Sequence, residues 1–109
     1  MQTNEARLDP KTCLVELNWP LNAHWAEETI RAFKEIAIQG AKRVVVNMEN
    51  VPFIDSSGLR ALLIGMEYLE GNAAQGWLAA PQAQARLFFK ITNFDKVFRI
   101  SERIPEAFS

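Results

Sequence analysis

The chain has a single cysteine, Cys13, and a single histidine, His24. One thiol cannot form an internal disulfide, and one thiol with one imidazole does not supply the three or four ligands of a protein zinc site. The chain also has no large excess of positive or negative charge: 12 Lys and Arg balance 13 Asp and Glu, for a net charge of −1. No basic stripe indicates a nucleic acid partner. We therefore expect no metal, no cofactor and no nucleic acid.

Long hydrophobic runs are missing as well. None approaches the roughly 20 apolar residues that a membrane-spanning helix needs, which predicts no membrane insertion. Residues 1–10 have no apolar segment and do not resemble a signal peptide. Five Gly and five Pro in 109 residues exclude collagen-like or low-complexity sequence. With 49% hydrophobic residues, we expect one cytoplasmic domain over residues 1–109.

Alternation and β-branched runs predict the strands. Residues 12–19 alternate apolar and polar side chains, which indicates a strand packed on one face, with residues 3–8 as its hairpin partner. Residues 44–48 begin with three valines, which is typical of a strand buried on both faces. Residues 76–80 predict a short strand, and residues 96–100 a last strand at the edge of the sheet.

Apolar residues at three- and four-residue steps predict the helices. The first spans residues 23–39 after Asn22 as N-cap, and the clearest spans residues 56–71. Two more are expected at residues 82–91 and 102–108. Strands that alternate with helices predict an α/β fold. We expect a mixed sheet of four or five strands, covered by about four helices mainly on one side or one edge.

Residues 53–59, FIDSSGL, follow a central strand and open the clearest helix. Asp55, Ser56 and Ser57 are each good N-cap residues, but a cap needs only one of them. Gly58 costs up to about 1 kcal/mol relative to Ala in a helix, which we interpret as room for a partner's close approach. A helix N-terminus favours negative charge, so a serine here is a suitable site for phosphorylation.

Residues 44–63, VVVNMENVPFIDSSGLRALL, resemble the STAS domain of the bacterial anti-sigma factor antagonists. The hallmark of that family is a strand, a short loop ending in hydrophobic-Asp-Ser-Ser/Thr-Gly-Leu, and a helix. The ending at residues 94–100, FDKVFRI, with Glu106-Ala107 also fits, so the resemblance extends from about Leu14 onward. It implies a single STAS-like domain.

The resemblance also implies a function, which is binding rather than catalysis. Ser56 would be phosphorylated by an anti-sigma factor that is also a serine kinase of the GHKL type, and reset by a PP2C-type phosphatase. The unphosphorylated form would bind the kinase and free a sigma factor. The residues implied in partner binding are Asp55, Ser57, Gly58, Leu59, Arg60 and Asn22.

One segment departs from the family pattern. Many members have Gly-x-Leu-Asp where residues 19–22 read Trp-Pro-Leu-Asn, in a loop near the phosphorylation site of the family fold. The departure leaves open an alternative: an accessory STAS subunit that binds the ATPase of a lipid-transport ABC system. Trp19 and Trp25 are interpreted as core residues, with an aromatic partner-binding patch as the alternative.

A small serine hydrolase is a weaker hypothesis. It would need His24 as the base for Ser56 or Ser57, and residues 54–58 lack the first glycine of a nucleophile elbow. Arg60 is the one cation near the motif in its helix. Its expected roles are exposure to solvent, contact with an acidic partner, or pairing with a phosphate on Ser56.

Overall fold

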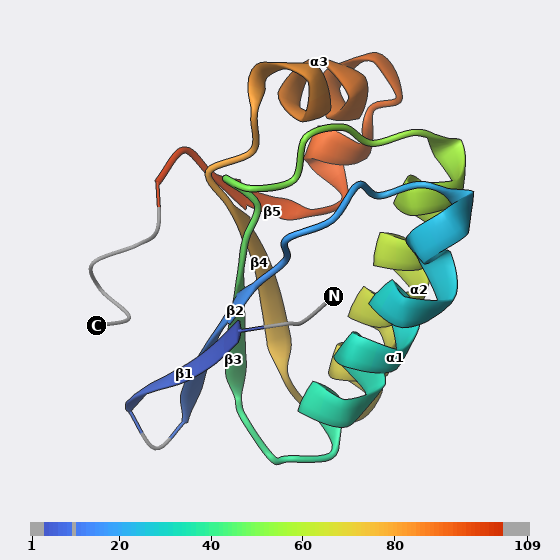
Figure 1. The fold of residues 1–109 in the computed structure, drawn as a ribbon. Helices are drawn as coiled ribbons and strands as arrows, with labels where there is room; N and C mark the ends of the chain where they lie inside the picture. The colour runs from blue at the N-terminus through green and yellow to red at the C-terminus, as the bar shows by residue number, and fades with distance from the viewer. Residues whose placement is uncertain (1–3, 10, 104–109) are drawn as a thin grey trace.

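The computed structural model describes residues 4–9 and 11–103 and has an α/β architecture on one five-stranded sheet (Figure 1). The strand order follows the chain: β1 pairs antiparallel with β2, and β2 to β5 are parallel. The expected mixed sheet and its N-terminal hairpin are confirmed. The strands are β1 (Asn4–Asp9), β2 (Thr12–Glu16), β3 (Arg43–Asn47), β4 (Gln75–Ala79) and β5 (Arg99–Ser101).

Helices cover one face and one end of the sheet, as expected. In Figure 1, α1 and α2 lie side by side against one face, and α3 lies beyond the end of β4. The long helix α2 has the bounds that its sequence pattern predicts. The α-helices of the described residues are α1 (Ala26–Ala37), α2 (Ser56–Gly71) and α3 (Ala83–Ile91), and the 3-10 helices are η1 (Ala23–Trp25) and η2 (Phe94–Lys96).

The core fills the space between the sheet and the two long helices. Val44 and Val46 lie in this core, and Val45 is buried in a separate cluster with Ala79 on the other face of the sheet. All three are fully buried, as their β-branched run predicts. α1 and α2 come close because Gly65 leaves room for an aromatic ring: a Cβ there would lie 2.5 Å from Phe33. Large, fully buried side chains from both long helices and from α3 complete the core, among them Phe33, Ile36, Leu62, Leu69 and Phe89.

The chain leaves the sheet earlier than expected after β2. The strand predicted over residues 12–19 ends at Glu16, and one further bond joins the Leu17 N–H to the Asn47 carbonyl at 3.2 Å. Trp19 then turns toward α1, where its indole Nε1–H donates to the buried Thr29 hydroxyl at 2.9 Å. Trp19 is 3% exposed, which confirms it as a core residue. Trp25 is half-buried and stacks on Trp19 with 5.9 Å between the ring centroids, so it packs against the core but remains partly accessible.

The C-terminal prediction is partly wrong. The strand expected at residues 96–100 begins only at Arg99, because the preceding residues form η2. Asn93 opens that turn in the left-handed conformation at φ 62°, and the Phe98 N–H closes it onto the Phe94 carbonyl at 2.9 Å. The helix expected at residues 102–108 falls almost wholly outside the described residues, of which the last two form a bend.

Candidate functional site

Two segments lie side by side at the carboxyl edge of the sheet and form the base of the candidate site. Leu21, after β2, forms a parallel bridge with Ile54, after β3. The Leu21 N–H donates to the Phe53 carbonyl at 2.9 Å, and the Asp55 N–H donates to the Leu21 carbonyl at 3.0 Å. The segment of residues 19–22 therefore directly supports the start of α2.

Asp55 is the N-cap of α2. Its backbone is extended (φ −124°, ψ −170°), and its side-chain oxygen accepts a hydrogen bond from the Gly58 N–H at 3.1 Å. Its carbonyl accepts the first helical bond from the Leu59 N–H at 2.9 Å. One of the three polar residues thus performs the capping, and Ser56 and Ser57 remain for another role.

Ser56 is the first residue of α2, and its side chain is exposed, whereas Ser57 is half-buried. Within the described part of the chain, neither hydroxyl has a hydrogen-bond partner. Unpaired N–H groups of the first turn and the helix dipole favour negative charge at this position. The Ser56 hydroxyl can therefore accept a phosphoryl group without the loss of an existing bond.

The space beside Gly58 is filled from within the chain. A Cβ at this position would lie 2.0 Å from the Leu21 carbonyl oxygen and 2.6 Å from the Leu21 Cβ. Our interpretation that a partner requires this space is therefore wrong. Leu59 is 8% exposed and packs into the core, so both residues shape the helix start and offer a partner little surface.

The other expected binding residues surround Ser56 to different degrees. Arg60 is exposed and lies four residues after Ser56, hence on the same side of α2. Asn22 is half-buried, and its side-chain oxygen accepts from the Trp25 N–H at 3.2 Å, as the N-cap of η1. Asp55 is half-buried, and Arg60 is the one cation within α2 itself.

Gln84 of α3 also reaches the site, and the sequence patterns do not reveal it. Its Oε1 accepts from the Ile54 N–H at 2.9 Å, and its Nε2 donates to the Ile54 carbonyl at 2.9 Å. Gln82 adds one bond, from its Nε2 to the Glu49 carbonyl at 2.8 Å, at the beginning of the same loop. Because Gln84 and Ile54 are 30 positions apart, only the fold shows this contact.

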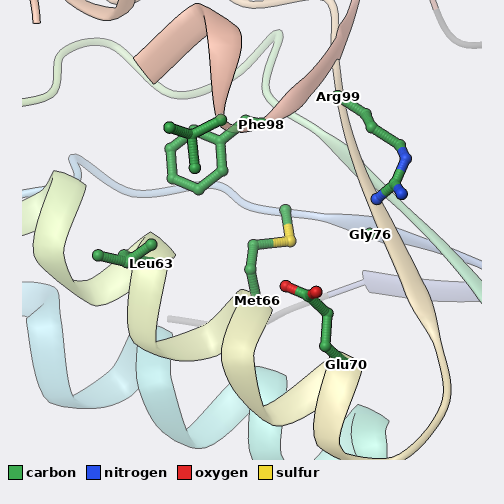
Figure 2. Close-up of a pocket in the computed structure, with 7 residues that line it drawn as sticks. Leu63, Met66, Glu70, Gly76, Phe98 and Arg99 are labelled. Carbon is green, nitrogen blue, oxygen red and sulfur yellow. The ribbon is translucent and has the colours of Figure 1, made fainter. Parts of the chain in front are cut away.

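A small cavity lies elsewhere, between α2, β4 and the start of β5 (Figure 2). Its volume of about 40 Å³ has room for a few water molecules, which is too little for a substrate. Residues 4–9 and 11–103 contain no group of three or more metal-ligating side chains and no helix long and apolar enough to cross a membrane. The cavity is lined by Leu63, Met66, Glu70, Gly76, Val97, Phe98 and Arg99.

Comparison with known sequences identifies relatives over most of the chain. The family model of the STAS domain matches residues 4–107. A STAS-domain containing protein from Pseudomonas aeruginosa is 36% identical over 70 residues, which cover 64% of this chain and 68% of that protein. The match to the family model includes the sheet, the three α-helices and the segment before α2.

Solved structures share the fold at lower identity. An anti-sigma factor antagonist from Mycobacterium paratuberculosis has a TM-score of 0.81 at 18% identity, covering 94% of this chain and 86% of that one. Unphosphorylated SpoIIAA, a Bacillus anti-sigma factor antagonist also solved in its phosphorylated form, has a TM-score of 0.73 at 21% identity, covering 97% and 90%. A sulfate transporter family protein from Wolinella succinogenes has a TM-score of 0.76 at 19% identity, covering 88% and 80%.

Proposed function

Because this chain belongs to the STAS domain family, we propose that it is an anti-sigma factor antagonist controlled by phosphorylation of Ser56. One observation carries the proposal: an exposed, unbonded serine hydroxyl stands at the N-terminus of α2, directly after the N-cap Asp55. The similarity to SpoIIAA, solved in both phosphorylation states, supports it. The unphosphorylated chain binds an anti-sigma factor and thereby frees a sigma factor.

The anti-sigma factor is proposed to be a serine kinase of the GHKL type. The Ser56 oxygen attacks the γ-phosphorus of ATP, the new O–P bond forms as the bond to the β-phosphate oxygen breaks, and ADP leaves. The hydroxyl proton passes to a base on the kinase. A PP2C-type phosphatase hydrolyses the phosphoserine and restores binding. Because the kinase step consumes ATP, the proposed location of the chain is the cytoplasm.

Phosphorylation acts on the partner more than on the fold. The phosphate adds about −1.5 to −2 charges at a helix N-terminus, which tolerates them. The same charge lies next to Asp55 and repels acidic groups of the partner, including its bound nucleotide. Arg60, on the same side of α2, is placed to contact either the phosphate or the partner.

The proposed partner surface does not include all of the binding residues expected from the sequence, because Gly58 and Leu59 are buried. It contains Asp55, Ser56, Ser57 and Arg60, with Asn22 on the adjoining segment. Gly58 and Leu59 are proposed to act indirectly, by fixing the position of the first helical turn.

The test begins with a pull-down from the native cell, using the tagged chain as bait. Recovery of a GHKL-type kinase supports the proposal, whereas recovery of an ABC transporter ATPase supports an accessory transport subunit instead. The recovered kinase is then incubated with ATP and the chain, and the phosphopeptide is mapped. We expect phosphate on Ser56 and its loss in Ser56→Ala but not in Ser57→Ala. Phosphate only on Ser57 contradicts the assignment.

A further inference from the structure

The three residues before α2 are hydrogen-bonded on both edges, as in a strand inside a sheet. On one edge, the Phe53 carbonyl and the Asp55 N–H bond to Leu21. On the other edge, the N–H and the carbonyl of Ile54 both bond to the Gln84 side chain, at 2.9 Å each. Successive peptide groups of an extended chain point to opposite edges, so the Gln84 amide stands where a further strand would be.

A carboxamide matches both backbone groups at this position. The Ile54 backbone offers one donor and one acceptor, and a primary amide presents one acceptor and one donor side by side. A carboxylate retains the acceptor but cannot donate, and an apolar side chain offers neither. Gln84 is exposed, whereas Ile54 is 1% exposed, so the hydrogen bonds rather than core packing define what Gln84 contributes.

We propose that Gln84 is a positioning residue for Ser56. Its side-chain amide ties α3 to the residue two positions before Ser56, and so fixes the segment that presents the hydroxyl to the kinase. The inference rests on the proposed function, because it concerns the phosphorylation of that same serine. It adds a residue that the sequence motif does not contain.

Phosphoryl transfer depends strongly on this placement. The Ser56 oxygen must approach the γ-phosphorus of ATP in line with the bond that breaks, and the enzyme contributes mainly by positioning and charge. The kinase supplies the base and holds the nucleotide, while the substrate chain must supply an ordered serine. Loss of both Gln84 bonds frees the Ile54 edge of the segment, so the hydroxyl occupies the productive position less often.

The experiment measures steady-state phosphorylation of Ser56 by the recovered kinase with ATP. We expect Gln84→Ala to lower kcat about tenfold, with KM changed less than about twofold, because the rest of the binding surface is unaltered. Gln84→Glu, which retains only the acceptor, is expected to fall between Gln84→Ala and the unaltered chain. Gln82→Ala is the matched control, since Gln82 makes a single bond at the far end of the same loop, and its kcat should stay within about twofold.

Amide hydrogen exchange provides an independent readout of the same contact. The Ile54 amide should exchange at least about tenfold faster in Gln84→Ala than in the unaltered chain, while the Phe33 and Leu62 amides keep their protection. Should Gln84→Ala fail to fold by circular dichroism, Gln84→Glu carries both measurements.

Three results overturn the inference: an unchanged kcat in Gln84→Ala, an equal fall in Gln82→Ala, or a raised apparent KM at unchanged kcat. The last would show a smaller folded fraction of substrate rather than a misplaced hydroxyl. Absence of phosphorylation in the unaltered chain is a different result, because it overturns the proposed function itself.

Discussion

A Cβ on Gly58 would lie 2.0 Å from the carbonyl oxygen of Leu21 and 2.3 Å from its carbonyl carbon. The first turn of α2 therefore packs directly onto the backbone of the segment after β2. The same Leu21 carbonyl accepts a hydrogen bond from the Asp55 N–H at 3.0 Å, which fixes its position. A flexible side chain could move aside, but this peptide group is held by the bridge to Ile54 and cannot.

The first prediction follows from this contact. Gly58→Ala should lower the free energy of unfolding by about 3 kcal/mol, because the added methyl overlaps fixed backbone. The control is Gly71→Ala at the end of α2, where nothing lies within 4 Å of the added Cβ. This control should be neutral or more stable by up to about 1 kcal/mol, since Ala is the better helix former. Urea unfolding of both variants makes the comparison, and an unchanged midpoint for Gly58→Ala would contradict it.

At Gly58 the sequence predicts the motif but not the contact with Leu21. The motif and the strand-to-helix position were predictable, because N-cap residues and an apolar stripe are local signals. The absence of a side chain at Gly58 indicates that another group lies close to the backbone. It does not show whether that group belongs to a partner or to the chain itself. Leu21 is 37 positions away, and only the parallel bridge to Ile54 brings it there. The contact of Gln84 with Ile54 could not be predicted from the sequence for the same reason, because the two residues are 30 positions apart.

The strand predicted over residues 96–100 begins three residues late for a different physical reason. Phe94 and Phe98 reach the core from the turn of η2 rather than from a strand. Asn93 permits that turn, because asparagine tolerates the left-handed conformation better than other non-glycine residues. The Phe98 ring then packs against the Phe89 ring of α3, with 5.8 Å between the centroids, and this contact between elements outweighs the local strand preference.

The second prediction separates the cap from the charge at Asp55. Asp55→Ala removes the acceptor for the Gly58 N–H and should lower stability by about 1 kcal/mol. Asp55→Asn retains a capping oxygen and should stay within about 0.5 kcal/mol of the unaltered chain. Thermal melts test this order. If both variants lose the same stability, Asp55 does not stabilise the helix through its hydrogen bond with the Gly58 N–H.

The third prediction compares two tightly packed glycines. A Cβ at Gly65 meets the Phe33 ring at 2.5 Å, and one at Gly76 meets the Met66 sulfur at 2.3 Å. Phe33 is 1% exposed and enclosed between helices, whereas Met66 borders the cavity of about 40 Å³ shown in Figure 2. Methionine is flexible and can shift into that cavity. Gly65→Ala should therefore cost at least about 1 kcal/mol more than Gly76→Ala in urea unfolding, and the reverse order would contradict this account of the packing.

The last prediction concerns charge at Ser56. Ser56→Glu should weaken binding to the anti-sigma partner at least about tenfold, because the new carboxylate lies beside Asp55 and repels acidic groups across the interface. Stability should change by less than about 1 kcal/mol, since Ser56 is exposed and a helix N-terminus favours negative charge. Ser56→Gln is the matched control, with nearly the same shape and no charge. Calorimetric titration at low and high salt measures the affinities.

If charge is the cause, the Glu and Gln variants should differ clearly at low salt and converge as salt screens the repulsion. Equal weakening by Glu and Gln at every salt concentration would show that the site rejects size rather than charge. In that case the phosphate would block the partner sterically, and Arg60→Ala should leave the affinity of the phosphorylated chain unchanged. With the electrostatic mechanism, Arg60→Ala instead removes the one cation beside the motif in α2 and should weaken the phosphorylated chain's binding further.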